Sequence, residues 1–133
     1  MDYRIYALIA LLFWGIWAYF SKILATNMKT ELLAFYTTFG SLIVVAVYTL
    51  IRTKIVFHST SVLAMIVGAL AMIATFAFYA ALAKGPASVI VPWTGLYIII
   101  PVVLGFIFLQ EKVTLNRLLG IAAAVISIIF LSK

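Results

Sequence analysis

Residues 55–83 read IVFHSTSVLAMIVGALAMIATFAFYAALA, a run of 29 residues without a single Asp, Glu, Lys or Arg. Crossing the hydrocarbon core of a bilayer takes about 20 predominantly apolar residues in a helix. A strand of a membrane barrel would alternate between apolar and polar residues, and apolar runs of this chain such as residues 98–100 and 121–126 do not. Because backbone groups in lipid must be hydrogen-bonded within the protein, we predict a membrane-spanning helix here.

The same pattern recurs along the rest of the chain. Four further uncharged runs cover residues 5–21, 32–51, 85–110 and 118–132. The first is long enough to span if Lys22 lies near its helix end, and the last if Arg117 extends to the headgroups. We therefore predict an all-α integral membrane protein, a single domain over 1–133, with five transmembrane helices at 5–25, 32–51, 62–83, 87–109 and 114–131.

Composition also favours lipid as the surrounding medium. Of the 133 residues, 68% are hydrophobic and 9% charged, and the mean hydropathy is +1.31. Soluble domains have about 45–50% apolar and about 25% charged residues. With no Cys and one His, the sequence offers no disulfide and no convincing metal site, and we expect no cofactor.

The formal charge of +6 comes from basic residues scattered at the ends of the apolar runs. We interpret them as membrane anchors and expect the lipid bilayer, not nucleic acid, as the partner. Five spans would place five basic residues on one side and three, or four with Lys22, on the other. This favours a cytoplasmic N-terminus by a small margin and leaves insertion in both orientations open. The two sets are Arg4, Arg52, Lys54, Lys112 and Arg117, and Lys29, Lys84 and Lys133.

Two residues near the N-terminus are candidates for solute binding. A cation within a span is costly and is by default a functional hypothesis, so Lys22 could face a cavity and attract an anionic solute. Alternatively, its side chain extends to the interface near Thr26 and Asn27. Trp14 lies near the predicted middle of the membrane and could line a solute path, or it could be an aromatic packing residue.

Residues 92–95 form a second candidate region, with Pro92, Trp93, Thr94 and Gly95, followed by Pro101. Pro92 removes the backbone donor for the carbonyl of Ser88. Interrupted helices often form transporter binding sites, so Trp93 and Thr94 could contact a solute there. The alternative is an ordinary proline kink stabilised by neighbouring helices.

Other residues are expected mainly to pack helices together or to cap helix ends. Tyr79 could hydrogen-bond a solute or a neighbouring helix, and Gly120 with Ala124 could let another helix approach closely. Glu111 is expected to cap the helix that follows it. All three carboxylates, including Asp2 and Glu31, fall at predicted helix ends, so no acid is placed for proton coupling within a span and no catalytic pair is visible. We do not expect an enzyme.

Several segments together resemble a known family. Leu12-Phe13-Trp14-Gly15 is followed by Lys22, residues 80–88 read AALAKGPAS before a proline-containing span, and residues 108–114 read FLQEKVT before Gly120. This pattern is similar to the EamA repeat of the drug/metabolite transporter superfamily, over essentially the whole chain. The resemblance implies transport of small metabolites, and usual members carry two such repeats in inverted orientation.

One repeat would need a second half from elsewhere, because alternating access rocks two halves around a shared site. We therefore expect a half-size transporter that moves a small polar or amphipathic metabolite across the cytoplasmic membrane. It would act as an antiparallel homodimer or with a half-size partner. The alternatives are a non-transporting subunit that stabilises or regulates another membrane complex and, with less support, an intramembrane enzyme.

Overall fold

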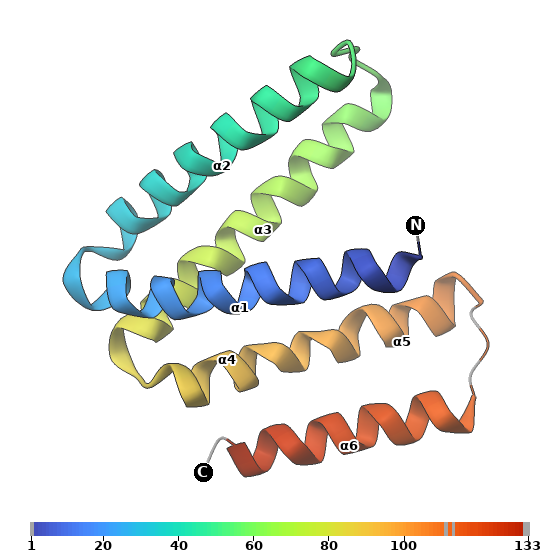
Figure 1. Cartoon of the computed structure of the whole chain (residues 1–133). Helices are drawn as coiled ribbons and strands as arrows, with labels where there is room; N and C mark the ends of the chain where they lie inside the picture. The colour runs from blue at the N-terminus through green and yellow to red at the C-terminus, as the bar shows by residue number, and fades with distance from the viewer. Residues whose placement is uncertain (1, 111, 113, 132–133) are drawn as a thin grey trace. The chain divides into compact units, whose positions relative to one another are not determined.

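The computed structural model describes residues 2–110, 112 and 114–131. These residues are almost entirely helical and contain no strand, so the all-α prediction is confirmed for them. The chain divides into an N-terminal unit, Met1–Lys84, and a C-terminal unit, Gly85–Lys133, which are described separately. The elements are α1 (Tyr3–Asn27), α2 (Thr30–Arg52), α3 (Ser59–Lys84), α4 (Ala87–Gly95), the 3₁₀ turn η1 (Leu96–Ile98), α5 (Ile99–Phe108) and α6 (Leu115–Leu131) (Figure 1).

Four helical segments are long and apolar enough to cross a membrane. They are α1, α2, α3 and the stretch Ala87–Phe108, with 22 to 26 residues each. At 1.5 Å per residue they extend about 33–39 Å, against about 30 Å for the hydrocarbon core. The fifth, α6, has 17 residues and extends about 26 Å. The five-span count therefore stays a prediction.

Arg117 lies in the first turn of α6, and the direction of its side chain affects whether α6 can span the membrane. Its Nη1 donates to the carbonyl of Lys112 at 3.1 Å, and Lys112 precedes the first residue of the helix. The guanidinium thus extends back beyond the helix start, which is the direction needed to reach the headgroups. Such an extension lets a slightly short helix span the core at modest cost.

Helix ends in the N-terminal unit differ slightly from the predicted ones. α1 begins at Tyr3, where the Asp2 carboxylate accepts a hydrogen bond from the Arg4 amide at 3.1 Å. α3 begins at Ser59, three residues before the predicted start at 62, because the Ser61 hydroxyl accepts from the His58 amide at 3.0 Å. Such side-chain acceptors satisfy backbone donors that have no partner inside the helix.

The N-terminal unit packs most tightly at one end. In Figure 1, α2 and α3 run side by side, and α1 meets them near its own C-terminal end and diverges toward its N-terminus. The small residues Ala18, Ser21 and Ala25 are buried on one face of α1 and allow close approach. The other buried residues of the unit are Leu33 and Ala34 on α2 and Tyr79 and Leu82 on α3. The divergence leaves the opposite part of the helices without a shared core.

The C-terminal unit corrects one expectation about prolines. The helix stays α-helical through Pro92 to Gly95 and changes to a 3₁₀ turn at Leu96–Ile98. Pro101, four residues after Tyr97, has no N–H to give to the Tyr97 carbonyl, and a tighter turn at that point follows. Pro101 itself occupies the first turn of α5, where a missing N–H costs little. The break therefore lies between the two prolines and not at Pro92.

Two glycines of this unit have different surroundings. α4 packs against α6, and a Cβ added at Gly95 would lie 3.9 Å from Cδ1 of Ile128 on α6, an ordinary contact. A Cβ at Gly120 would meet nothing within 4 Å. Gly120 and Ala124 instead line a groove of about 380 Å³ between α5 and α6. The close approach expected at Gly120 is thus absent among the described residues of this unit.

Candidate functional site

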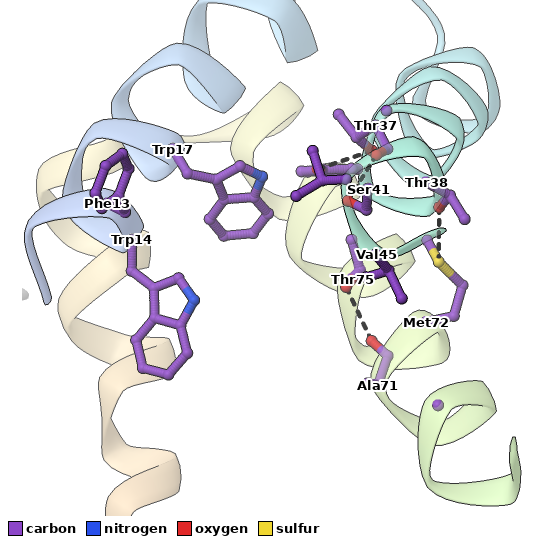
Figure 2. Close-up of a pocket in the computed structure, with 14 residues that line it drawn as sticks. Phe13, Trp14, Trp17, Thr37, Thr38, Ser41, Val45, Ala71, Met72 and Thr75 are labelled. Atoms are coloured by element: carbon purple, nitrogen blue, oxygen red, sulfur yellow. Dashed lines mark hydrogen bonds between the residues drawn. The ribbon is translucent and has the colours of Figure 1, made fainter. Parts of the chain in front are cut away.

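An open groove of about 840 Å³ lies in the N-terminal unit, where α1 diverges from α2 and α3 (Figure 2). Its lining residues recur on each helix at spacings of three and four, which places them on one helix face. The lining comprises Phe13, Trp14 and Trp17 from α1, Thr37, Thr38, Gly40, Ser41, Val44 and Val45 from α2, and Gly68, Ala71, Met72, Thr75 and Tyr79 from α3.

The α1 side of this groove is aromatic. Figure 2 shows the rings of Trp14 and Trp17 extending from α1 toward the side where Thr37, Ser41 and Thr75 lie. Trp17 stacks on Phe78 with ring centroids 5.4 Å apart and contacts Tyr79 at 5.8 Å. Trp14 is 64% exposed and Trp17 40%. Trp17 is therefore held in place by α3, whereas the Trp14 ring lines the more open part.

The α2 and α3 side carries hydroxyl groups. Thr37 donates to the carbonyl of Leu33 at 2.8 Å, and Ser41 donates to that of Thr37 at 2.9 Å. Thr75 donates to the carbonyl of Ala71 at 2.9 Å. In each case the hydroxyl bonds to the preceding turn of its own helix. Each oxygen keeps lone pairs that can accept a hydrogen bond.

Tyr79 links the two helices of that side. It has no exposed surface, and its hydroxyl donates to Oγ1 of Thr37 at 3.2 Å. The Tyr79 hydroxyl thus stabilises the contact between α2 and α3, and the Tyr79 ring forms part of the groove lining beside Trp17. Of the five residues predicted to bind solute, Trp14 and Tyr79 are brought together here.

Lys22 is outside the groove lining. Its Nζ donates to the carbonyl of Leu82 at 2.6 Å, in the last turn of α3. The residue four positions after Leu82 is Pro86, which has no N–H to offer that carbonyl. The ammonium also lies at the negative end of the α3 dipole. Lys22 thus does not line this groove, and the alternative that its side chain extends to the membrane interface near Thr26 and Asn27 stays a prediction.

The other predicted residues lie in the C-terminal unit. Trp93 is 58% exposed on α4, and the Thr94 hydroxyl donates to the carbonyls of Ile90 and Val91, both at 3.0 Å. Glu111 lies outside the described residues. Within residues 2–110, 112 and 114–131, no cluster of His, Asp or Glu could hold a metal ion.

Most residues of the groove lining were not among the predicted site residues. The residues predicted to bind solute did not include Phe13, Gly68, Met72 or the hydroxyl residues of α2. A signal was present, because Thr37, Ser41 and Val45 recur every four residues. The same spacing marks one face on each of α1, α2 and α3. Whether these three faces lie around one groove depends on how the helices pack, which the sequence of a single helix does not reveal.

Comparison with known proteins places the chain in a family. A family model described as the EamA-like transporter family matches residues 3–133. The chain is 32% identical over 131 residues to the protein of Methanocaldococcus jannaschii named Uncharacterized protein MJ1333.1, covering 96% of this chain and 94% of that protein. No solved structure matches the chain.

These findings agree with the helices described above. The family is one of transporters and not of enzymes. The resemblance of this chain to the family was expected from the segments around Trp14, Pro86 and Gly120. Long apolar helices give the chain the form of a multi-pass membrane protein. The chain belongs to the EamA-like transporter family.

Proposed function

We propose that this chain is a half-size transporter that moves a small polar or amphipathic metabolite across the cytoplasmic membrane, with the N-terminal groove as part of the solute path. The observation that carries the proposal is the groove itself. Helices long enough to span a bilayer present aromatic faces and hydroxyl oxygens to a space of about 840 Å³. Binding sites for small molecules typically combine an apolar lining with a few polar groups.

We further propose that the two units form one transmembrane domain and that a second copy, in antiparallel orientation, supplies the other half of the transporter. The nearly balanced basic residues on the two sides permit both orientations. A half-size partner would serve the same purpose. The similar length of the Methanocaldococcus protein supports a unit of about this size.

Among the predicted site residues, Trp14 is proposed to contact solute from the N-terminal unit, and Tyr79, which has no exposed surface, is proposed to hold Trp17 and Thr37 in the groove wall. Trp93 and Thr94 are the candidates from the C-terminal unit. Lys22 is proposed to act mainly by holding the end of α3, since its ammonium already bonds the Leu82 carbonyl. Pro92, Gly95 and Pro101 are proposed to shape the helical segment around the 3₁₀ turn.

The test uses the purified full chain in liposomes with a panel of radiolabelled amino acids, amines, amides and glycosides. The proposal expects saturable flux of at least one solute above that of protein-free liposomes. Trp14→Ala should reduce this flux while leaving membrane insertion intact. The matched control is Phe20→Ala, which removes an exposed aromatic ring of α1 outside the groove lining.

Two other outcomes would change the conclusion. Absence of flux across the whole panel would favour a non-transporting subunit of another membrane complex. Equal flux in the Trp14→Ala and Phe20→Ala variants would remove the groove from the solute path. Orientation mapping with a C-terminal reporter tests the assembly separately, since an antiparallel homodimer requires both orientations and a single orientation would contradict it.

A further inference from the structure

We propose that the N-terminal groove selects uncharged solutes that combine an apolar ring with both hydrogen-bond donors and acceptors, and that it rejects anions. This inference rests on the proposed function, in that the groove is taken as the solute path. It goes further by naming the class of solute and by excluding the anionic class that a cavity-facing Lys22 would have attracted.

The first argument is the charge of the groove. None of its described lining residues is an Asp, Glu, Lys, Arg or His. Lys22 is engaged at the Leu82 carbonyl, outside the lining. A charge that enters an apolar environment without a partner loses hydration and gains little in return. Aromatic faces partly compensate a cation through the ring quadrupole but offer an anion nothing comparable.

The second argument is the direction of the available hydrogen bonds. On the α2 and α3 side, the hydroxyl hydrogens of Ser41 and Thr75 are used within their own helices, which leaves oxygen lone pairs as acceptors. On the α1 side, the indole N–H groups of Trp14 and Trp17 make no hydrogen bond within the described part of the chain. A solute that bridges the groove would accept from α1 and donate toward α2 and α3.

Sugar and polyol hydroxyls satisfy both requirements, because each can donate and accept. A ring substituent would add stacking on the tryptophan faces. A carboxylate can only accept, so it would leave the acceptor side unpaired and would carry an unpartnered charge. An ammonium can only donate, so it would leave the indole side unpaired. The expected order of affinity is therefore uncharged first, cation second and anion last.

The test compares three ligands that differ only at carbon 6 of the sugar. They are phenyl β-D-glucoside, its 6-amino-6-deoxy analogue and phenyl β-D-glucuronide. Binding to the full chain in detergent is measured by isothermal titration calorimetry at neutral pH. We expect the glucuronide to bind roughly tenfold or more weakly than the glucoside, as an unpaired buried polar group generally costs.

Variants then test the direction of the hydrogen bonds. Trp14→Phe keeps an aromatic ring but removes the N–H, and Ser41→Ala removes an acceptor. Each should weaken glucoside binding roughly fivefold or more. The control Ser127→Ala removes an exposed hydroxyl from α6, outside the groove lining, and should leave affinity unchanged.

The outcomes separate this inference from the proposed function. Absent glucoside binding, or glucuronide binding at least as tight, would overturn the selectivity inference even if liposome flux of other solutes persists. Glucoside binding with the expected order, but no flux of any panel solute, would support the selectivity and overturn the transport function. Equal effects of Ser41→Ala and Ser127→Ala would overturn the assignment of acceptors to the groove.

Discussion

Replacing Lys22 with Met tests how the N-terminal unit is held together. The Met side chain keeps the aliphatic stem and removes the ammonium, which donates to the Leu82 carbonyl at 2.6 Å. That carbonyl lies in the last turn of α3, and the position from which a helix would normally supply a donor is Pro86. We therefore expect Lys22→Met to destabilise the contact between α1 and α3.

The magnitude follows from the kind of bond that is lost. Hydrogen bonds to charged groups contribute about 1.5–3 kcal/mol in soluble proteins. In membrane proteins, measured side-chain hydrogen bonds average about 0.6 kcal/mol and reach about 1.7 kcal/mol. The Lys22 bond is short, charged and partly buried, so we expect a loss near the upper end, about 1–2 kcal/mol in the free energy of unfolding.

The assay is reversible unfolding of the detergent-solubilised chain by added sodium dodecyl sulfate, followed by far-ultraviolet circular dichroism. Lys29→Met is the matched control, because Lys29 is exposed and makes no capping hydrogen bond with its side chain. It should change stability by less than about 0.5 kcal/mol. Unchanged stability of Lys22→Met combined with lost transport would refute the reasoning and would assign the ammonium to the solute.

Further predictions concern Tyr79, Thr37 and Pro92. Tyr79→Phe removes the bond to Thr37 and should lower the free energy of unfolding by about 1 kcal/mol, measured by the same titration. Thr37→Val leaves the fully buried Tyr79 hydroxyl without this acceptor and should cost about 1–3 kcal/mol, and the double variant should lose less than the sum; strict additivity would argue against the bond. Pro92→Ala returns an N–H toward the Ser88 carbonyl, so it should stabilise α4 and, if that carbonyl without a helical donor serves transport, reduce liposome flux. Undiminished flux in Pro92→Ala would make Pro92 an ordinary kink.

Long apolar runs were sufficient to predict the helices, because a span needs length and hydropathy more than any particular residue. Helix ends were less predictable, since they depend on single acceptors such as Ser61 and Asp2. An interruption or kink was expected at Pro92, but the helix changes to a 3₁₀ turn only at Leu96–Ile98, before Pro101. Both prolines lack a backbone N–H. Only Pro101 lies four residues after a residue of the 3₁₀ turn, Tyr97, whose carbonyl therefore has no α-helical donor.

The candidate site shows a similar division. Trp14 was identified from its depth in a span and Tyr79 from its capacity to hydrogen-bond, and both line the groove. The partner of Lys22 lies 60 residues away in the chain, so its hydrogen bond could not be read from local spacing. The absence of a donor at Pro86 was nevertheless visible in the sequence, and it predicts that the end of α3 needs a side-chain donor from elsewhere.

The surroundings of Gly68 offer the most direct test of the groove as the solute path. Gly68 lines the groove, and a Cβ added there meets nothing within 4 Å. Gly68→Leu should therefore fold normally and fill part of the space, since Leu is also the better helix former. Gly15 has equally open surroundings on α1 but is not part of the groove lining, so Gly15→Leu is the matched control.

The decisive measurement is liposome flux, in both variants, of the panel solute that the wild-type chain moves fastest. If the groove carries the solute, Gly68→Leu loses most of the flux while Gly15→Leu retains it, at equal protein insertion. Full flux through the Gly68→Leu variant would contradict the account.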